Sequence, residues 1–203
     1  MRVPSMTEHT SPAKLVLNVE SVGFTPEQFA LLCRDNPDLR LELTAQREIV
    51  IMPPTYSDTG RQESEILYQL QAWAKRDGRG LVFGSSTGFT LPNGAIRSPD
   101  ASWIPKEKWN ALNRRQREES FAPICPDFVI ELRSRSDTLL QLSTKMSEYI
   151  ANGAELGFLI DPFTRQVHVY RPGRSPRRLH SSTTVGGGSL LPGFTLRLKD
   201  IWG

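Results

Sequence analysis

The sequence is poor in the residues that build disulfides and zinc sites: it has two cysteines and three histidines among 203 residues. Cys33 and Cys125 lie far apart and show no metal-ligand spacing, which indicates two free thiols in a reducing compartment and favours the cytoplasm. His9, His168 and His180 are isolated from one another, so they predict no histidine-based metal site. A disulfide scaffold and a zinc module are therefore excluded.

The sequence also lacks a long apolar run and a strong charge of one sign. No stretch approaches the roughly 18 apolar residues that a membrane-spanning helix requires, and the N-terminus lacks a signal-peptide core. Lys and Arg number 25 against 22 Asp and Glu, so the net charge of +3 permits a polyanionic partner without requiring one. We expect a soluble protein with one domain over residues 21–203, preceded by a flexible arm over residues 1–20.

Alternating helical and strand-like patterns predict a mixed α/β sheet flanked by helices. Apolar spacing and breakers predict helices over residues 26–35, 58–76, 105–119 and 139–152. The predicted N-caps are Thr25, Thr59 in a capping box with Gln62, and Ser136 or Asp137. Strands are predicted over residues 39–52 (a hairpin), 81–83, 88–91, 95–104, 128–132, 156–160, 166–170 and within 190–202, with a basic loop over 171–178.

One predicted strand, residues 128–132, combines a nearly continuous apolar run with a single carboxylate, Glu131. Such a run is typical of a strand covered on both faces. A buried carboxylate costs several kcal/mol unless a cation, hydrogen bonds or a metal ion compensates it. The two-residue period of a strand puts Asp127, Glu131 and Arg133 on one face, so the sequence predicts an acid and a base that point the same way.

A second acid, Asp100, lies on the predicted strand 95–104, and Lys145 lies on the helix that follows the strand of Glu131. Two carboxylates on neighbouring strands can share a divalent cation such as Mg²⁺, with waters completing the oxygen shell. With Arg133 or Lys145 nearby, this set favours hydrolysis of a nucleic-acid backbone. A purely structural interpretation stays open, in which Asp100 caps a turn and Glu131 forms an ion pair.

Several segments resemble the Uma2-type restriction endonucleases, a bacterial family of the PD-(D/E)XK nuclease superfamily. The segments that carry the resemblance are residues 51–55, 59–60, 86–89, 91–103, 125–134, 145–149, 152–154 and 159–162. They occur in the order of the family's motifs, and the similarity runs from about residue 24 to residue 202. The resemblance implies a restriction-endonuclease-like fold.

The resemblance also implies roles for individual residues. Asp100 matches the superfamily's first metal-binding aspartate and Glu131 its second acid. The superfamily usually has Lys two residues after that acid, where this chain has Arg133, so Lys145 is an alternative for the lysine's role. Glu42 resembles an upstream acid that adds to the metal site. The implied cofactor is Mg²⁺, with Mn²⁺ as a substitute, the implied substrate is DNA, and a homodimer is one expected assembly.

Two other interpretations remain from the sequence. A catalytically inactive member would keep the fold and act in nucleic-acid binding or assembly. A purely structural dimer would use the helices of Trp73 and Trp109 as its interface. Arginines outside the predicted site could contact phosphates or line solvated loops: Arg114, Arg115, Arg117, Arg165, Arg171, Arg174, Arg177 and Arg178.

Overall fold

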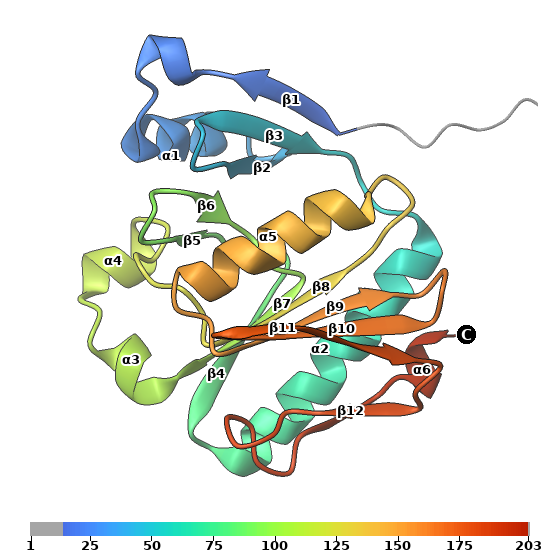
Figure 1. Cartoon of the computed structure of the whole chain (residues 1–203). Coiled ribbons are helices and arrows are strands. Elements are labelled where there is room, and N and C mark those ends of the chain that lie inside the picture. Colours follow the sequence, from blue (N-terminus) through green and yellow to red (C-terminus); the bar gives the residue numbers. More distant parts are fainter. Residues whose placement is uncertain (1–13, 203) are drawn as a thin grey trace, which may run out of the picture.

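The computed structural model describes residues 14–202, which form one six-stranded sheet, one five-stranded sheet and a small two-stranded sheet with flanking helices (Figure 1). The strands of the six-stranded sheet are, in order, β11 (Arg174–His180), β10 (Gln166–Arg171), β9 (Leu156–Asp161), β8 (Phe128–Leu132), β7 (Ala101–Pro105) and β4 (Gly80–Gly84). Its neighbouring strands are antiparallel except β8 and β9, which are parallel. The predicted mixed sheet flanked by helices is confirmed.

The five-stranded sheet lies beside the six-stranded one and carries the early hairpin. Its strands are, in order, β1 (Leu15–Asn18), β3 (Glu48–Met52), β2 (Arg40–Leu43), β6 (Ile96–Arg97) and β5 (Phe89–Thr90). The two-stranded sheet pairs β12 (Thr184–Gly186) with β13 (Thr195–Arg197). The prediction of a loose arm over residues 1–20 is wrong for β1, because backbone pairing with β3 holds these four exposed residues, and residues 1–13 lie outside the described part.

The helices are η1 (Glu20–Val22), α1 (Pro26–Asp35), α2 (Ser57–Asp77), α3 (Lys106–Asn110), α4 (Arg114–Glu118), α5 (Leu139–Ala151) and α6 (Lys199–Trp202). Thr25 and Gln28 form the capping box of α1, as the Thr25 prediction required. The cap predictions for α2 and α5 are wrong: Tyr56 precedes α2, and Thr138 caps α5 because its hydroxyl accepts from the Gln141 amide. In the described part of the chain, no helix is both long and apolar enough to cross a membrane.

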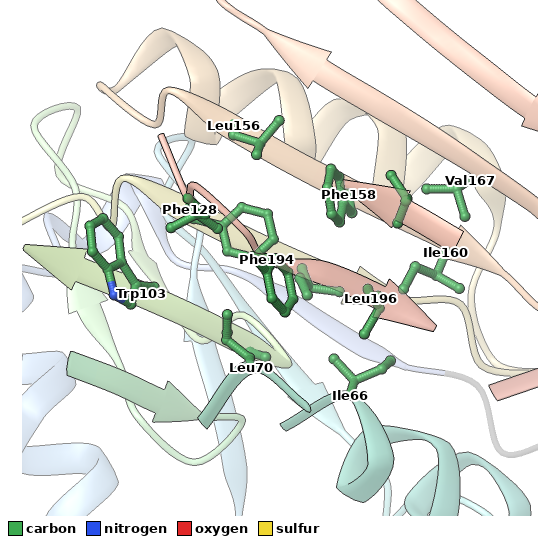
Figure 2. Close-up of a cluster of buried hydrophobic side chains, with 14 of the residues drawn as sticks. Ile66, Leu70, Trp103, Phe128, Leu156, Phe158, Ile160, Val167, Phe194 and Leu196 are labelled. Carbon is green, nitrogen blue, oxygen red and sulfur yellow. The ribbon is translucent and has the colours of Figure 1, made fainter. Parts of the chain in front are cut away.

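Strand β8 is covered on both faces, as its apolar run predicts. One face carries Phe128 and Ile130, which pack in a core with Ile66 and Leu70 of α2 (Figure 2). The opposite face carries Val129, which packs with Met146 and other residues of α5. The same face carries Glu131, only 3% exposed, so the carboxylate lies under α5 rather than in solvent.

Three predicted elements differ in the structure. Residues 95–104 form two strands in different sheets, β6 and β7, because the chain crosses between sheets at Ser98-Pro99, where Pro99 has no amide to donate to a ladder. Residues 105–119 form two short helices, α3 and α4. The basic segment 171–178 is mostly strand β11, which pairs with β10 through its backbone.

Trp73, on one of the two helices predicted to form the structural dimer, is not an interface residue, because it belongs to the core of this chain. It is 5% exposed, and the centre of its ring lies 6.0 Å from the centre of the Trp103 ring and 5.5 Å from the centre of the Phe194 ring. Its indole N–H donates to the Pro192 carbonyl at 3.0 Å. No face of this ring is left for a second protein.

Candidate active site

The pairing of β7 with β8 brings Asp100 and Glu131 together. The antiparallel register places Ala101 opposite Ile130, so the next position along both strands places Asp100 opposite Glu131. Residues directly opposite in an antiparallel pair project from the same face. Both carboxylates line one small cavity of about 40 Å³, so the structure brings the two predicted acids to a single site.

Asp100 lies immediately before β7, at the point where the chain enters the six-stranded sheet. Its Oδ2 accepts a hydrogen bond of 2.7 Å from the amide of Leu132, which fixes the carboxylate against the end of β8. Burial raises the pKa of Asp100 to about 6, and the negative charge of Glu63 adds to this, although Lys145 and the Leu132 amide oppose it. The carboxyl group therefore holds its proton more tightly than an exposed aspartate.

Glu131 is anchored by two side chains of α5. The hydroxyl of Tyr149 donates to Glu131 Oε1 at 3.1 Å, and the ammonium of Lys145 lies 2.9 Å from the same oxygen. Burial raises the pKa of Glu131 to about 8; Lys145 opposes this rise, while Asp100 and Glu42 reinforce it. Among the described residues, Glu131 Oε2 and Asp100 Oδ1 accept no hydrogen bond, so each carboxylate keeps one oxygen available to the cavity.

Lys145 bridges Glu131 to Glu42 of β2. Its ammonium lies 2.8 Å from Glu42 Oε1, which also accepts from the Ser98 amide at 2.9 Å, and the second oxygen of Glu42 pairs with Arg97 at 3.2 Å. Although burial alone would raise the pKa of Glu42, Lys145 and Arg97 hold it at about 2. Both Glu42 oxygens are thus engaged by protein groups.

The structure places Arg133 away from this cluster. Strand β8 ends at Leu132, and the Arg133 guanidinium pairs with the buried Asp161 at 3.0 Å and lies 5.3 Å from the centre of the Phe163 ring. Asp127, four residues before Glu131 on the same strand face, pairs with Lys108 at 3.2 Å instead. Of the two cations considered for the superfamily lysine, Lys145 is the one that contacts the acids.

Comparison with known proteins identifies the family of this chain. A family model named Uma2 and described as "Putative restriction endonuclease" matches residues 26–199. The chain belongs to the Uma2 family. A solved structure described as a putative nuclease belonging to DUF820, from Anabaena variabilis, has a TM-score of 0.73 and 22% identity, and covers 88% of this chain and 97% of its own. A comparison with curated proteins found no match.

Two acidic residues of this Uma2 protein lie near the site without having been predicted for it. Glu63 of α2 lines the same cavity, and burial together with the charges of Glu131 and Asp137 raises its pKa, against the effect of Arg40. The signal in the sequence was its position: Glu63 lies three residues before Ile66 and seven before Leu70, on the apolar face of the helix. Glu148 of α5 pairs with Arg97 at 2.6 Å and so extends the ion-pair network.

The cavity fits a divalent cation through its two facing carboxylates. Among residues 14–202, no three His, Cys, Asp or Glu side chains converge into a ready-made metal cage. Mg²⁺, however, usually keeps several waters and takes one or two protein carboxylates. Asp100 and Glu131 offer one oxygen each, and burial raises the pKa of both, so their ionised forms carry a desolvation cost that a bound cation would offset.

Proposed function

We propose that this Uma2 protein is a divalent-metal-dependent endonuclease that hydrolyses phosphodiester bonds in DNA, with Mg²⁺ or Mn²⁺ as its cofactor. The observation that supports it best is that Asp100 and Glu131 line one cavity. Each carboxylate has one oxygen that accepts no hydrogen bond from the described residues. Family membership supports the nuclease class. The choice of DNA and of the metal belongs to the proposal.

In this mechanism Asp100 and Glu131 hold the ion. A bound divalent cation would polarise the phosphodiester and lower the pKa of an attacking water. Lys145 keeps its proton, because although burial alone would lower its pKa, Glu131 and Glu42 raise it well above the usual value. Its ammonium is therefore a fixed positive charge at the cavity wall, suited to stabilising charge that develops on the phosphate.

Glu42 has a positioning role in this proposal rather than the metal-ligand role that the resemblance implies. Its carboxylate binds Lys145, the Ser98 amide and Arg97 at once, so it fixes the lysine beside Glu131. Arg133 has no catalytic role in it, because its guanidinium is held by Asp161. A homodimer remains a prediction.

Cleavage of a supercoiled plasmid with Mg²⁺ or Mn²⁺ tests the site. We expect Asp100→Asn and Glu131→Gln to abolish cleavage, and Lys145→Gln to reduce it by about 100-fold or more, the usual effect of losing one transition-state donor. Asp127→Asn is the matched control, because it neutralises another buried acid of the same strand face. Full cleavage by Asp100→Asn or Glu131→Gln would rule out this site.

One observation favours a second candidate, a nuclease-fold protein without turnover: Glu131 is already paired with Lys145, as it would be in a purely structural ion pair. Calorimetric titration separates the two candidates. A working site takes up Mg²⁺ or Mn²⁺, and Asp100→Asn removes that uptake. An inactive binding or assembly protein shows no uptake that depends on Asp100.

A further inference from the structure

A second cavity, of about 240 Å³, lies against the same two walls as the acidic one. On one wall, Thr55 and Glu63 line the acidic cavity, while Tyr56 and Thr59, from the same stretch of chain, line the second. On the other wall, Ser134 and Ser136 line the acidic cavity, while Arg135 between them lines the second. The two cavities therefore lie along the same two stretches of chain, residues 55–63 and 134–136, so the second cavity lies near the acidic one.

Two exposed aromatic rings line this second cavity. Tyr56 is 51% exposed and Phe163 is 48% exposed, although both side chains are large and apolar. Tyr56 precedes α2, where its side chain makes no capping hydrogen bond. Neither ring belongs to one of the hydrophobic cores of the described residues.

The ring of Phe163 is held in place by a buried acid. Asp161, which is fully buried, accepts from the Phe163 amide at 3.1 Å and from the Thr164 hydroxyl at 2.8 Å, and these bonds fix the turn after β9. Arg133 pairs with the same carboxylate and lies over the Phe163 ring. The exposed ring therefore packs against a guanidinium that a fully buried carboxylate holds in place, as expected of a preorganised binding surface.

The charge around the rings suits a phosphate backbone. The guanidinium of Arg135 lies 5.5 Å from the centre of the Phe163 ring and belongs to an exposed side chain. Trp202 lines this cavity and also a third cavity, whose lining includes Arg165 and Lys199. The acid at the second cavity, Asp58, is paired with Arg61 at 3.2 Å. Aromatic rings interleaved with cations are the pattern that binds single-stranded nucleic acid, through base stacking and phosphate contacts.

We propose that this second cavity binds an unpaired nucleobase of the substrate, stacked on Phe163 and Tyr56, with Arg135 at a neighbouring phosphate. The inference rests on the proposed function, because that function makes the ligand a nucleic acid. A base inside a duplex has both faces covered by its neighbours, so it cannot stack on a protein ring without leaving the helix. The substrate class is therefore single-stranded DNA, or DNA with an unpaired nucleotide beside the cleaved bond.

Fluorescence anisotropy with the full chain in EDTA tests this without any cleavage step. The probes are a labelled oligothymidylate, an abasic strand of equal length that carries the same phosphates, and a blunt duplex. We expect the wild type to bind oligothymidylate about tenfold or more tightly than the abasic strand and more tightly than the duplex, since stacking on one ring changes affinity by about that factor.

Substitutions of Phe163 and Tyr56 test whether these two rings cause the preference for oligothymidylate over the abasic strand. Phe163→Ala and Tyr56→Ala should each weaken oligothymidylate binding by about tenfold and leave abasic binding unchanged, while Phe163→Trp should retain it. Tyr68→Ala is the matched control, because Tyr68 is a 64% exposed tyrosine of α2 that lines neither cavity. Equal binding of the three probes by the wild type, or unchanged binding by both alanine variants, would overturn the inference. The cleavage assay with Asp100→Asn decides the proposed function separately.

Discussion

At the scale of single residues, the site is a balance of buried charge. Lys145 contacts Glu42 and Glu131, and Arg97 contacts Glu42 and Glu148. Glu42 is therefore paired with two cations, whereas Glu131 is paired with Lys145 alone. Asp100 adds a further acid that pairs with no cation side chain among the described residues. Burial is the main cause of the raised pKa values of Asp100 and Glu131, whereas at Glu42 the two cations Lys145 and Arg97 outweigh burial and lower the pKa.

The raised pKa values make stability depend on pH. Glu131 titrates at about 8 in the folded chain against 4.5 ordinarily, and Asp100 at about 6 against 3.8. Between these limits Asp100 and Glu131 bind more protons in the folded state than in the unfolded state. The stability that these two groups contribute is therefore fully present below about pH 4 and is lost as the pH rises toward 8. The slope is at most about 1.4 kcal/mol per pH unit for each proton.

Urea denaturation in EDTA measures this dependence. We expect the free energy of unfolding to fall between about pH 5 and pH 8 in the wild type, and Glu131→Gln to remove most of the fall because the amide does not ionise. Glu118→Gln, on the exposed surface of α4, controls for the loss of one acid. Parallel pH profiles for the wild type and Glu131→Gln would show that Glu131 is ionised throughout this range.

At the scale of elements, the close contact of β4 with β7 depends on a residue without a side chain. Gly80 pairs with Pro105 at the edge of the six-stranded sheet, and a Cβ at position 80 would overlap the indole of Trp103. Trp103 is 2% exposed and packs against Trp73, so its ring cannot move aside without displacing the core. The absence of a side chain at Gly80 is what allows β4 to cover this ring.

We expect Gly80→Ala to destabilise the chain by about 1–3 kcal/mol, the usual cost of overpacking a core. Gly60→Ala is the matched control, since Gly60 lies in α2 with nothing within 4 Å of an added Cβ, and it should stabilise by about 0.5–1 kcal/mol through helix propensity. Chemical denaturation midpoints of the two variants should shift in opposite directions. A shift of both in the same direction would contradict the packing argument at Gly80.

The elements that the sequence predicted are those whose apolar pattern matches their burial. Strand β8 and helix α5 are examples, because each presents a regular apolar face to a core. Strand β11 was mistaken for a loop, because six of its seven residues are exposed and the backbone pairing with β10 that orders it leaves no apolar alternation to detect. The break at Pro99 was visible in the sequence, but the run of strand-forming residues around it hid the change of sheet.

At the scale of the whole molecule, the sequence could predict which two acids lie together better than which cation contacts them. Asp100 and Glu131 meet because two short strands pair, and a linear pattern can suggest that. Arg133 does not reach the two acids because its guanidinium pairs with Asp161, which lies on a strand 28 residues further along the chain. Lys145 is therefore the cation at the site. Glu63 enters the site because α2 packs against the six-stranded sheet; its spacing places it on the apolar face of α2 but does not show which acids it meets.

The molecule also has an open edge that its sequence protects. Strand β11 is the outermost strand of the six-stranded sheet, and an unpaired edge can recruit the same edge of another copy. It carries three exposed arginines, Arg174, Arg177 and Arg178, and Pro176 removes one amide from the edge. Positive charges facing each other across two copies would repel, so these residues oppose edge-to-edge pairing.

A variant with Arg174→Thr, Arg177→Thr, Arg178→Thr and Pro176→Val should therefore self-associate, because it has a long, uncharged edge strand with its amide restored. Sedimentation velocity should show a sedimentation coefficient that rises with protein concentration for this variant. The matched control replaces Arg114, Arg115 and Arg117 of α4 by threonine, which removes the same charge from an exposed helix. Equal association of both variants would assign the effect to lost net charge, whereas association of the β11 variant alone shows that the three arginines and Pro176 together prevent pairing at the sheet edge.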